Sequence, residues 1–320
     1  MPERYVEVNG LKKYFYTPAG VLHAVDGISF AIDRGKTIGV VGESGCGKST
    51  AGRLMVRLLE PTAGEILFDG ADIAKLGKKA LKEYRKKIQI IFQDPFSSLN
   101  PRKTIYDTIS EPLIIHRQHG GRAKLGGRVH ELMELTGLAD RLVNSYPHEL
   151  DGGRRQRIGI ARALALNPEF IVCDEPVSAL DVSIQAQILN LLKSLQKSFG
   201  YTYMFITHDL SVVKHFSDEI LVMYLGQTVE KAPVKELFKN PRHPYTKALL
   251  SAIPIPRLTD KPKRILLQGE IASPINPKDE CRFASRCGFA AEKCFKATPA
   301  ITAVSDGHDV RCCRLDEIAE

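Results

Sequence analysis

The chain has 320 residues, of which 43% are hydrophobic and 26% are charged, and its net charge is +8 at pH 7. These values are those of an ordinary globular protein with one large core and an appendage, or with two modest domains. The basic residues are spread along the chain, so no specific nucleic-acid partner is expected. No apolar run approaches the roughly 20 residues of a membrane span, and residues 1–16 lack a signal-peptide core. We therefore expect a protein that stays in the cytoplasm.

Apolar and β-branched runs predict a series of strands, and helical periodicity fills the middle of the chain. The predicted strands are Tyr5–Val8, Val21–Ile32, Thr37–Val41, Glu65–Asp69, Ile88–Phe92, Phe170–Asp174, Tyr203–Thr207 and Glu219–Tyr224. The predicted helices are Ala51–Leu59, Val129–Thr136, Gln156–Leu166 and Val182–Ser198. This order indicates an α/β core with a helical subdomain inserted at about residues 94–165.

The segment from residue 42 to residue 50 reads GESGCGKST and lies between a predicted strand and a predicted helix. Its three glycines let backbone N–H groups and the helix N-terminus converge on phosphate oxygens. Lys48 adds a positive charge there, and Ser49 offers a hydroxyl to Mg²⁺. The residues expected to bind the nucleotide are Gly42, Ser44, Gly45, Cys46, Gly47, Lys48, Ser49 and Thr50. The sequence thus predicts binding of a nucleoside triphosphate.

Four polar residues each follow an apolar strand, which predicts a site at the carboxyl edge of one sheet. Asp174 is expected to hold Mg²⁺ through water, and Glu175 to orient or deprotonate the attacking water. Gln93 is placed to reach the metal and that water, so the expected Mg²⁺ ligands are Ser49 and Gln93. His208 is expected to hydrogen-bond the γ-phosphate.

Over roughly residues 5–230 the chain resembles the nucleotide-binding subunit of an ATP-binding-cassette (ABC) transporter. The resemblance implies a P-loop NTPase fold. The motifs occur in the family's order as Walker A (42–50), Q-loop (Gln93), signature (150–154), Walker B (170–175), D-loop (178–181) and switch histidine (His208). Phe15 stands where the family stacks an aromatic ring on adenine. The resemblance implies that two such subunits enclose two ATP molecules head to tail and drive a membrane-spanning pair.

The signature departs from the family's usual LSGGQ, because this chain reads LDGGR. The resemblance implies that Asp151, Gly152 and Gly153 face the partner's ATP. A carboxylate at position 151 would repel that γ-phosphate, with Arg154 and Arg155 offsetting part of the repulsion. Alternatively, Asp151 caps the helix that starts at Gly152, a role that serine and aspartate fill equally well. The first interpretation favours a partner ATPase of different sequence.

Seven cysteines are unevenly distributed, and five of them fall in the last 40 residues. Cys46 and Cys173 are expected to be small buried thiols. The five C-terminal cysteines are Cys281, Cys287, Cys294, Cys312 and Cys313. Four thiolates suit a tetrahedral zinc ion or a [4Fe–4S] cluster, and the spacing lacks the paired C-x2-C of a zinc ribbon.

The C-terminal segment resembles that of dipeptide and oligopeptide importer ATPases at residues 241–254, 269–277, 281–287 and 307–313. The resemblance implies an iron–sulfur cluster on Cys281, Cys287, Cys294 and Cys312, with zinc as the alternative. Cys313 stands where such sequences often have histidine, and His308 is expected to be structural. Nothing in the sequence brings the cluster near the ATP site, so we expect a structural role for it.

We therefore expect an ABC nucleotide-binding domain at residues 1–239 and a small cysteine-rich domain at 240–320. The predicted function is ATP hydrolysis that powers peptide import from the cytoplasmic face of the membrane. The expected partners are a second ATPase subunit, two permease subunits and, indirectly, an extracytoplasmic peptide-binding protein. The alternatives are a soluble cassette ATPase that acts on nucleic acid or ribosomes, a redox-sensing regulatory ATPase, and an importer ATPase for nickel or sugars.

Overall fold

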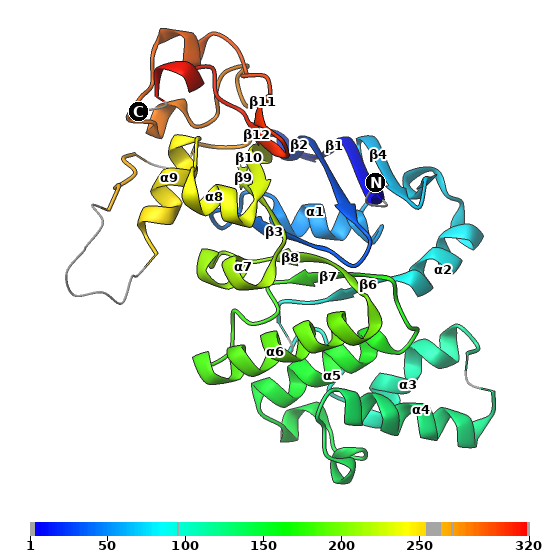
Figure 1. The fold of residues 1–320 in the computed structure, drawn as a ribbon. Coiled ribbons are helices and arrows are strands. Elements are labelled where there is room, and N and C mark those ends of the chain that lie inside the picture. The colour runs from blue at the N-terminus through cyan, green and yellow to red at the C-terminus, as the bar shows by residue number, and fades with distance from the viewer. Residues whose placement is uncertain (1–3, 95, 119, 254–263, 270–271, 319–320) are drawn as a thin grey trace. The chain divides into compact units, whose positions relative to one another are not determined.

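The structure is a computed structural model that describes residues 4–94, 96–118, 120–253, 264–269 and 272–318 (Figure 1). Residue 254 and residues 270–271, which belong to the segments that resemble peptide importers, lie outside the described residues. The chain divides into two compact units. Unit 1 comprises Met1–Ala74 and Phe205–Glu320, and unit 2 comprises Lys75–Met204.

Unit 1 contains an antiparallel sheet of four strands in the order β2-β1-β4-β5. The strands are β1 (Arg4–Thr17), β2 (Gly20–Asp33), β4 (Ala63–Phe68) and β5 (Ala71–Asp72). Strand β1 continues well beyond the predicted run Tyr5–Val8, because it is paired along most of its length with β2, whereas β2 exceeds the predicted Val21–Ile32 by one residue at each end. Buried Val6, Val8 and Leu11 on β1 form part of the core.

The second sheet of unit 1 is mixed and runs in the order β11-β12-β10-β9-β3-β8. Its strands are β3 (Thr37–Val41), β9 (Glu219–Tyr224), β10 (Gln227–Pro233), β11 (Thr302–Ser305) and β12 (His308–Val310). The last two residues of β8 (Thr202–Ile206) also belong to unit 1. Strand β3 is wholly buried and pairs in parallel with β9. The helices of unit 1 are α1 (Lys48–Met55), α7 (Leu210–Phe216), α8 (Val234–Lys239) and α9 (Pro244–Ser251).

Unit 2 contains the parallel pair β6 (Ile88–Ile91) and β7 (Phe170–Asp174), followed in the strand order by the start of β8. Its helices are α2 (Lys78–Lys87), α3 (Ile105–Ile115), α4 (Arg122–Leu135), α5 (Gly152–Leu164) and α6 (Val182–Phe199). Helices α3, α4 and α5 contact one another, which confirms a helical region in this part of the chain (Figure 1). Helix α6 connects the two buried strands β7 and β8, as predicted.

The predicted strands Thr37–Val41, Phe170–Asp174 and Glu219–Tyr224 match β3, β7 and β9 residue for residue. The predicted helix Ala51–Leu59 is displaced, because α1 begins at Lys48 and Arg57 already has a positive φ of 53°. The regular elements after residue 233 are short, as the proline content predicts: α9 spans eight residues and β11 four. Among the described residues, no helix is both long and apolar enough to cross a bilayer.

Candidate functional site

The phosphate-binding loop of unit 1 connects β3 to α1, and its backbone approaches neighbouring strands too closely for any side chain. A Cβ atom at Gly42 would lie 2.2 Å from the carbonyl oxygen of Met223, and one at Gly47 would lie 2.1 Å from that of Ala24. Gly47 also has a φ of 103°, in the left-handed region, and is the N-cap of α1. These positions therefore require glycine, whatever the loop binds.

Lys48 opens α1 and is 4% exposed. Its ammonium donates to the carbonyl oxygens of Gly42, at 2.8 Å, and Glu43, at 3.0 Å, so the charge is held inside the loop. Helix α1 has no side-chain N-cap, and N–H groups at a helix N-terminus attract phosphate. Cys46 is buried as predicted, and burial raises the pKa of its thiol.

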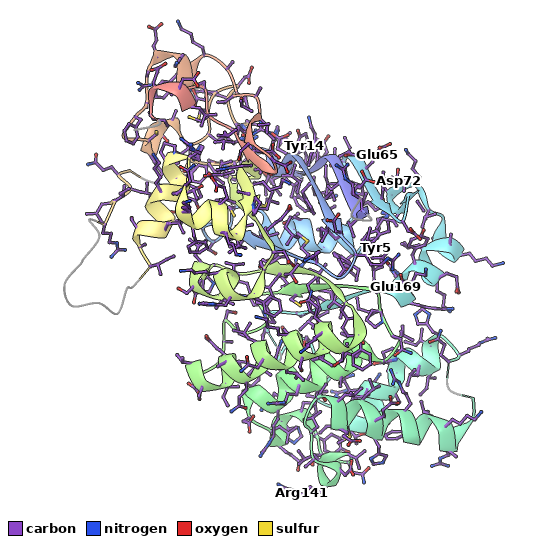
Figure 2. All side chains as sticks on the ribbon, viewed as in Figure 1. Tyr5, Tyr14, Glu65, Asp72, Arg141 and Glu169 are labelled. Carbon is purple, nitrogen blue, oxygen red and sulfur yellow. The ribbon has the colours of Figure 1, made fainter. Side chains whose placement is uncertain are left out.

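Tyr14, labelled in Figure 2, lies on β1 next to Phe15 and forms a side-chain network with residues of β2. The Tyr14 hydroxyl donates to Asp26, and its ring stacks on His23 with ring centroids 3.9 Å apart. Arg282 also binds the Asp26 carboxylate. Burial acts to raise the pKa of Asp26, but these hydrogen bonds and the Arg282 charge lower it overall. Phe15, predicted to stack on adenine, is half-buried, with the Lys13 ammonium 5.0 Å from its ring.

Unit 2 holds Gln93, Asp174 and Glu175. The Gln93 side-chain amide donates to the Glu175 carboxylate at 2.9 Å, so two residues predicted to act on water are in contact. Asp174 ends β7 and is 2% exposed. Glu175 has a φ of 46°, which is uncommon for a non-glycine residue and typical of functional sites.

His208 belongs to unit 1 and follows the end of β8. Its side chain is exposed, and the next residue, Asp209, caps α7 by accepting the backbone N–H of Ser211 at 2.7 Å. The loop that carries His208 is therefore anchored by the start of a helix. The residues predicted for the ATP site thus divide between the units: the Walker A loop, Phe15 and His208 lie in unit 1, and the Q-loop, signature, Walker B and D-loop motifs lie in unit 2.

Asp151 is the N-cap of α5, where its carboxylate accepts the backbone N–H of Arg154 at 2.8 Å. The Arg154 guanidinium lies 3.4 Å from the same carboxylate. Arg155 is directed elsewhere: it donates to the Pro147 carbonyl oxygen at 2.6 Å and stacks on Phe96. The capping interpretation is therefore borne out by the geometry, whereas the expectation that Arg155 offsets the Asp151 charge is wrong.

The five C-terminal cysteines line one small cavity of unit 1. The sulfurs of Cys281, Cys287 and Cys312 each accept the backbone N–H of the residue two positions later, at 3.4 Å in the case of Cys312. Cys294 and Cys313 lie with their sulfurs 3.6 Å apart. Burial raises the pKa of the Cys281 thiol to about 12. Residues far apart in sequence thus converge as a set of sulfur donors.

Sulfur donors of this kind can bind a metal, but the distances between these five cysteines do not suit a single metal ion. Among the described residues, no three His, Cys, Asp or Glu side chains are grouped closely enough to hold one metal ion. A zinc ion, with Zn–S bonds of about 2.3 Å, requires all four thiolates to lie within about 4 Å of one another. His308 is bound elsewhere, since its Nε2 lies 2.7 Å from the buried carboxylate of Glu230.

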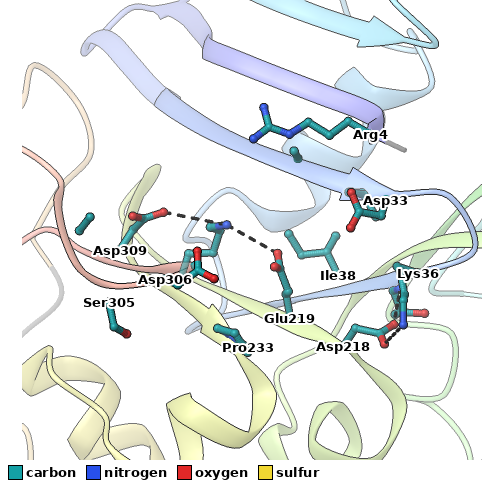
Figure 3. Close-up of a pocket in the computed structure, with 16 residues that line it drawn as sticks. Arg4, Asp33, Lys36, Ile38, Asp218, Glu219, Pro233, Ser305, Asp306 and Asp309 are labelled. Atoms are coloured by element: carbon teal, nitrogen blue, oxygen red, sulfur yellow. Dashed lines mark hydrogen bonds and ion pairs between the residues drawn. The ribbon is translucent and has the colours of Figure 1, made fainter. Parts of the chain in front are cut away.

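A separate cavity of about 870 Å³ in unit 1 lies beside the end of β2, the start of β3 and the β11–β12 hairpin (Figure 3). Lys231 in its wall lies 3.6 Å from Glu219 and 3.9 Å from Asp309, and Lys36 lies 3.0 Å from Asp218. None of the predicted site residues lines this cavity. Because these charges pair with one another, we assign the cavity no ligand.

The structure adds contacts to the phosphate-binding loop that the motifs did not predict. Arg286 forms two hydrogen bonds with the Glu43 carboxylate, at 2.7 and 3.1 Å, and the Tyr245 hydroxyl accepts the Glu43 N–H at 2.9 Å. A cavity of about 280 Å³ at the loop is lined partly by Ala272–Pro274. In the sequence, the only feature that pointed to these contacts was the presence of arginines next to cysteines at residues 281–287.

A phosphate-binding loop between a buried parallel strand and a helix, with acids at the end of another buried strand, defines a P-loop ATPase. Residues 25–178 match the family described as ABC transporter, and residues 229–294 match the oligopeptide/dipeptide transporter C-terminal region. The oligopeptide transport ATP-binding protein AppF of Bacillus subtilis is 51% identical, over 97% of both chains. The protein called OppF in that organism is 58% identical over 80% of this chain and 84% of its own length.

Solved structures agree with this assignment. The dimeric ATP-binding cassette MJ0796, in a post-hydrolysis state with ADP and phosphate, is 30% identical and has a TM-score of 0.66. It covers 72% of this chain and 98% of its own. CbiO1 of Clostridium perfringens, part of the transporter complex cbiONQ, is 30% identical with a TM-score of 0.64, over 74% of this chain and 92% of its own. The chain belongs to the ATP-binding proteins of the ABC transporter family.

Proposed function

We propose that this chain is the ATP-binding and ATP-hydrolysing subunit of an importer for oligopeptides. The proposal rests on relatives called oligopeptide transport ATP-binding proteins and on the match of residues 229–294 to the peptide-transporter C-terminal region. The structural observation that supports ATP binding is the phosphate-binding loop. Lys48 is held inside this loop, and backbone carbonyl groups of neighbouring strands lie close to its glycines. No observation favours nucleic acid, nickel or sugar as the substrate.

Each unit supplies part of the proposed chemistry. In unit 1 the N–H groups of residues 42–50 bind the phosphates, Lys48 neutralises their charge, and Ser49 supplies a hydroxyl for Mg²⁺. His208 is the proposed hydrogen-bond partner of the γ-phosphate. In unit 2 Gln93 serves as a further Mg²⁺ ligand, and Asp174 holds the metal through water.

Glu175 is the proposed general base, which takes a proton from the water that attacks the γ-phosphate. The hydrogen bond from the Gln93 amide, at 2.9 Å, orients the Glu175 carboxylate for this role. The water oxygen bonds to the γ-phosphorus and the bond to the bridging oxygen of ADP breaks, which gives inorganic phosphate and ADP. Lys48, with Mg²⁺ when bound, would offset the negative charge that develops on ADP.

The proposed assembly contains two ATPase subunits and two permease subunits, with this chain peripheral on the cytoplasmic face of the membrane. The second ATPase is proposed without a requirement that it be a different chain, because Asp151 caps α5 as the serine of the usual signature would. The dimeric arrangement of the related cassette MJ0796 supports a paired ATPase.

Reconstitution tests the proposed function directly. The assembled transporter in proteoliposomes should hydrolyse ATP faster when the binding protein carries oligopeptide, and it should accumulate labelled peptide. The same assembly with Glu175→Gln serves as the matched inactive control. An intact assembly whose ATPase responds to nickel or sugar but not to peptide would contradict the cargo assignment.

We further propose that Cys281, Cys287, Cys294 and Cys312 hold an iron–sulfur cluster. Support comes from their convergence on one cavity and from the backbone N–H groups directed at three of the sulfurs. Such hydrogen bonds stabilise thiolates and tune clusters. When bound, the group would link chain segments that have little apolar core of their own.

A further inference from the structure

The phosphate-binding loop carries one acidic side chain, Glu43, and the C-terminal segment holds it. Arg286 binds both carboxylate oxygens, with Nη1 2.7 Å from one and Nη2 3.1 Å from the other. The Arg286 side chain is 8% exposed, and that of Glu43 is 26% exposed. A bidentate ion pair that is partly buried, like this one, has a defined geometry that an exposed ion pair lacks.

The backbone of Glu43 is held from the same direction. The hydroxyl of Tyr245 on α9 accepts the Glu43 N–H at 2.9 Å. The Tyr245 ring is fully buried and packs against Tyr224, with centroids 4.8 Å apart, and against Phe283, at 5.4 Å. The hydroxyl is thus fixed by an aromatic cluster that joins α9, β9 and the cysteine-bearing segment, residues 281–313.

All three polar groups of Glu43 are therefore occupied. Its N–H is bound by Tyr245, its carboxylate by Arg286, and its carbonyl oxygen by the Lys48 ammonium at 3.0 Å. A shift of this residue would move the carbonyl group that orients Lys48. An unpaired carboxylate here would also add a negative charge beside the phosphates.

We propose that Arg286 and Tyr245 are positioning residues of the ATP site, through which the cysteine-bearing segment sets the conformation and charge of the phosphate-binding loop. The inference deepens the proposed function and rests on ATP binding at residues 42–50. It also bears on the expectation that nothing brings the cysteines near the ATP site, because Arg286, which binds Glu43, directly precedes Cys287.

Equilibrium binding of MgATP to the purified full chain provides the test. Arg286→Gln should raise the dissociation constant about tenfold, because it leaves the Glu43 carboxylate unpaired near the phosphates. Glu43→Gln should have a smaller effect, and adding it to Arg286→Gln should restore most of the affinity. Tyr245→Phe removes only the hydroxyl and should also weaken binding.

Arg314→Gln is the matched control. Arg314 also adjoins a cysteine and forms an ion pair, at 2.8 Å from Glu317, but it makes no contact with the loop in the described structure. Its loss should change the dissociation constant by less than about twofold. Circular dichroism confirms that each variant is folded.

The proposal is overturned if folded Arg286→Gln and Tyr245→Phe bind MgATP as the unaltered chain does, or if Glu43→Gln gives no rescue. Lys48→Ala separates this outcome from failure of the proposed function. If Lys48→Ala abolishes binding while Arg286→Gln does not weaken it, only the positioning role fails. If the unaltered chain does not bind MgATP, the proposed function itself fails.

Discussion

Replacing Asp151 tests whether this carboxylate caps a helix or acts on the partner's nucleotide. Its geometry is that of an N-cap, with a 2.8 Å bond from the Arg154 N–H. Loss of such a bond on substitution by alanine costs about 1 kcal/mol. The accompanying ion pair contributes close to zero, because its side chains are 48% and 59% exposed.

Asp151→Ala should therefore lower the free energy of opening the first turn of α5 by about 1 kcal/mol. This corresponds to roughly fivefold faster exchange of the amide hydrogens in that turn. Asp151→Ser and Asp151→Asn keep a cap and should exchange within about twofold of the unaltered chain. Hydrogen–deuterium exchange followed by mass spectrometry measures this on the purified protein.

The same variants in the assembled transporter address the charge. If Asp151 acts as a cap, Asp151→Ser should leave the KM for ATP and the turnover unchanged within about twofold. A tenfold or larger fall in KM with Asp151→Ser would show that the carboxylate repels the partner's γ-phosphate. Equal exchange rates for the alanine and serine variants would refute the capping account.

Glu175→Gln should preserve MgATP binding but slow turnover of the assembled transporter by roughly 10²-fold, and unchanged turnover would remove this residue from the mechanism. Burial lowers the pKa of His243 to about 4, against the opposing charge of Glu230. As pH drops from about 6.5 to 4, His243 takes up a proton in the unfolded chain before it does so in the folded chain, so the free energy of unfolding should fall, by about 2 kcal/mol at pH 5. His243→Asn should weaken this pH dependence, and urea titrations at pH 7 and pH 5 measure it. Protein purified without oxygen should be brown with about four irons per chain, and Cys294→Ser should release them but keep ATP binding; a colourless preparation with one zinc would contradict the cluster.

The sequence by itself determined the elements and residues whose signals are local. Strands β3, β7 and β9 follow from unbroken apolar runs, since a buried strand needs apolar residues on both faces. The phosphate-binding loop follows from a fixed spacing of glycines and Lys48. Strands β10 and β12 were missed, because β10 is stabilised mainly by pairing with β9, and β12 by pairing with β10 and β11, and not by a strong pattern of their own.

Only the tertiary structure decided what each polar group contacts. Asp151 could repel a phosphate or cap a helix on sequence grounds, and the orientation of the Arg154 N–H selects the cap. Glu43 and Arg286 are 243 positions apart, and no periodicity or motif encodes their pairing. Such a contact forms because the whole chain brings two segments together, so the link between the cysteine-bearing segment and the phosphate-binding loop could be seen only in the folded protein.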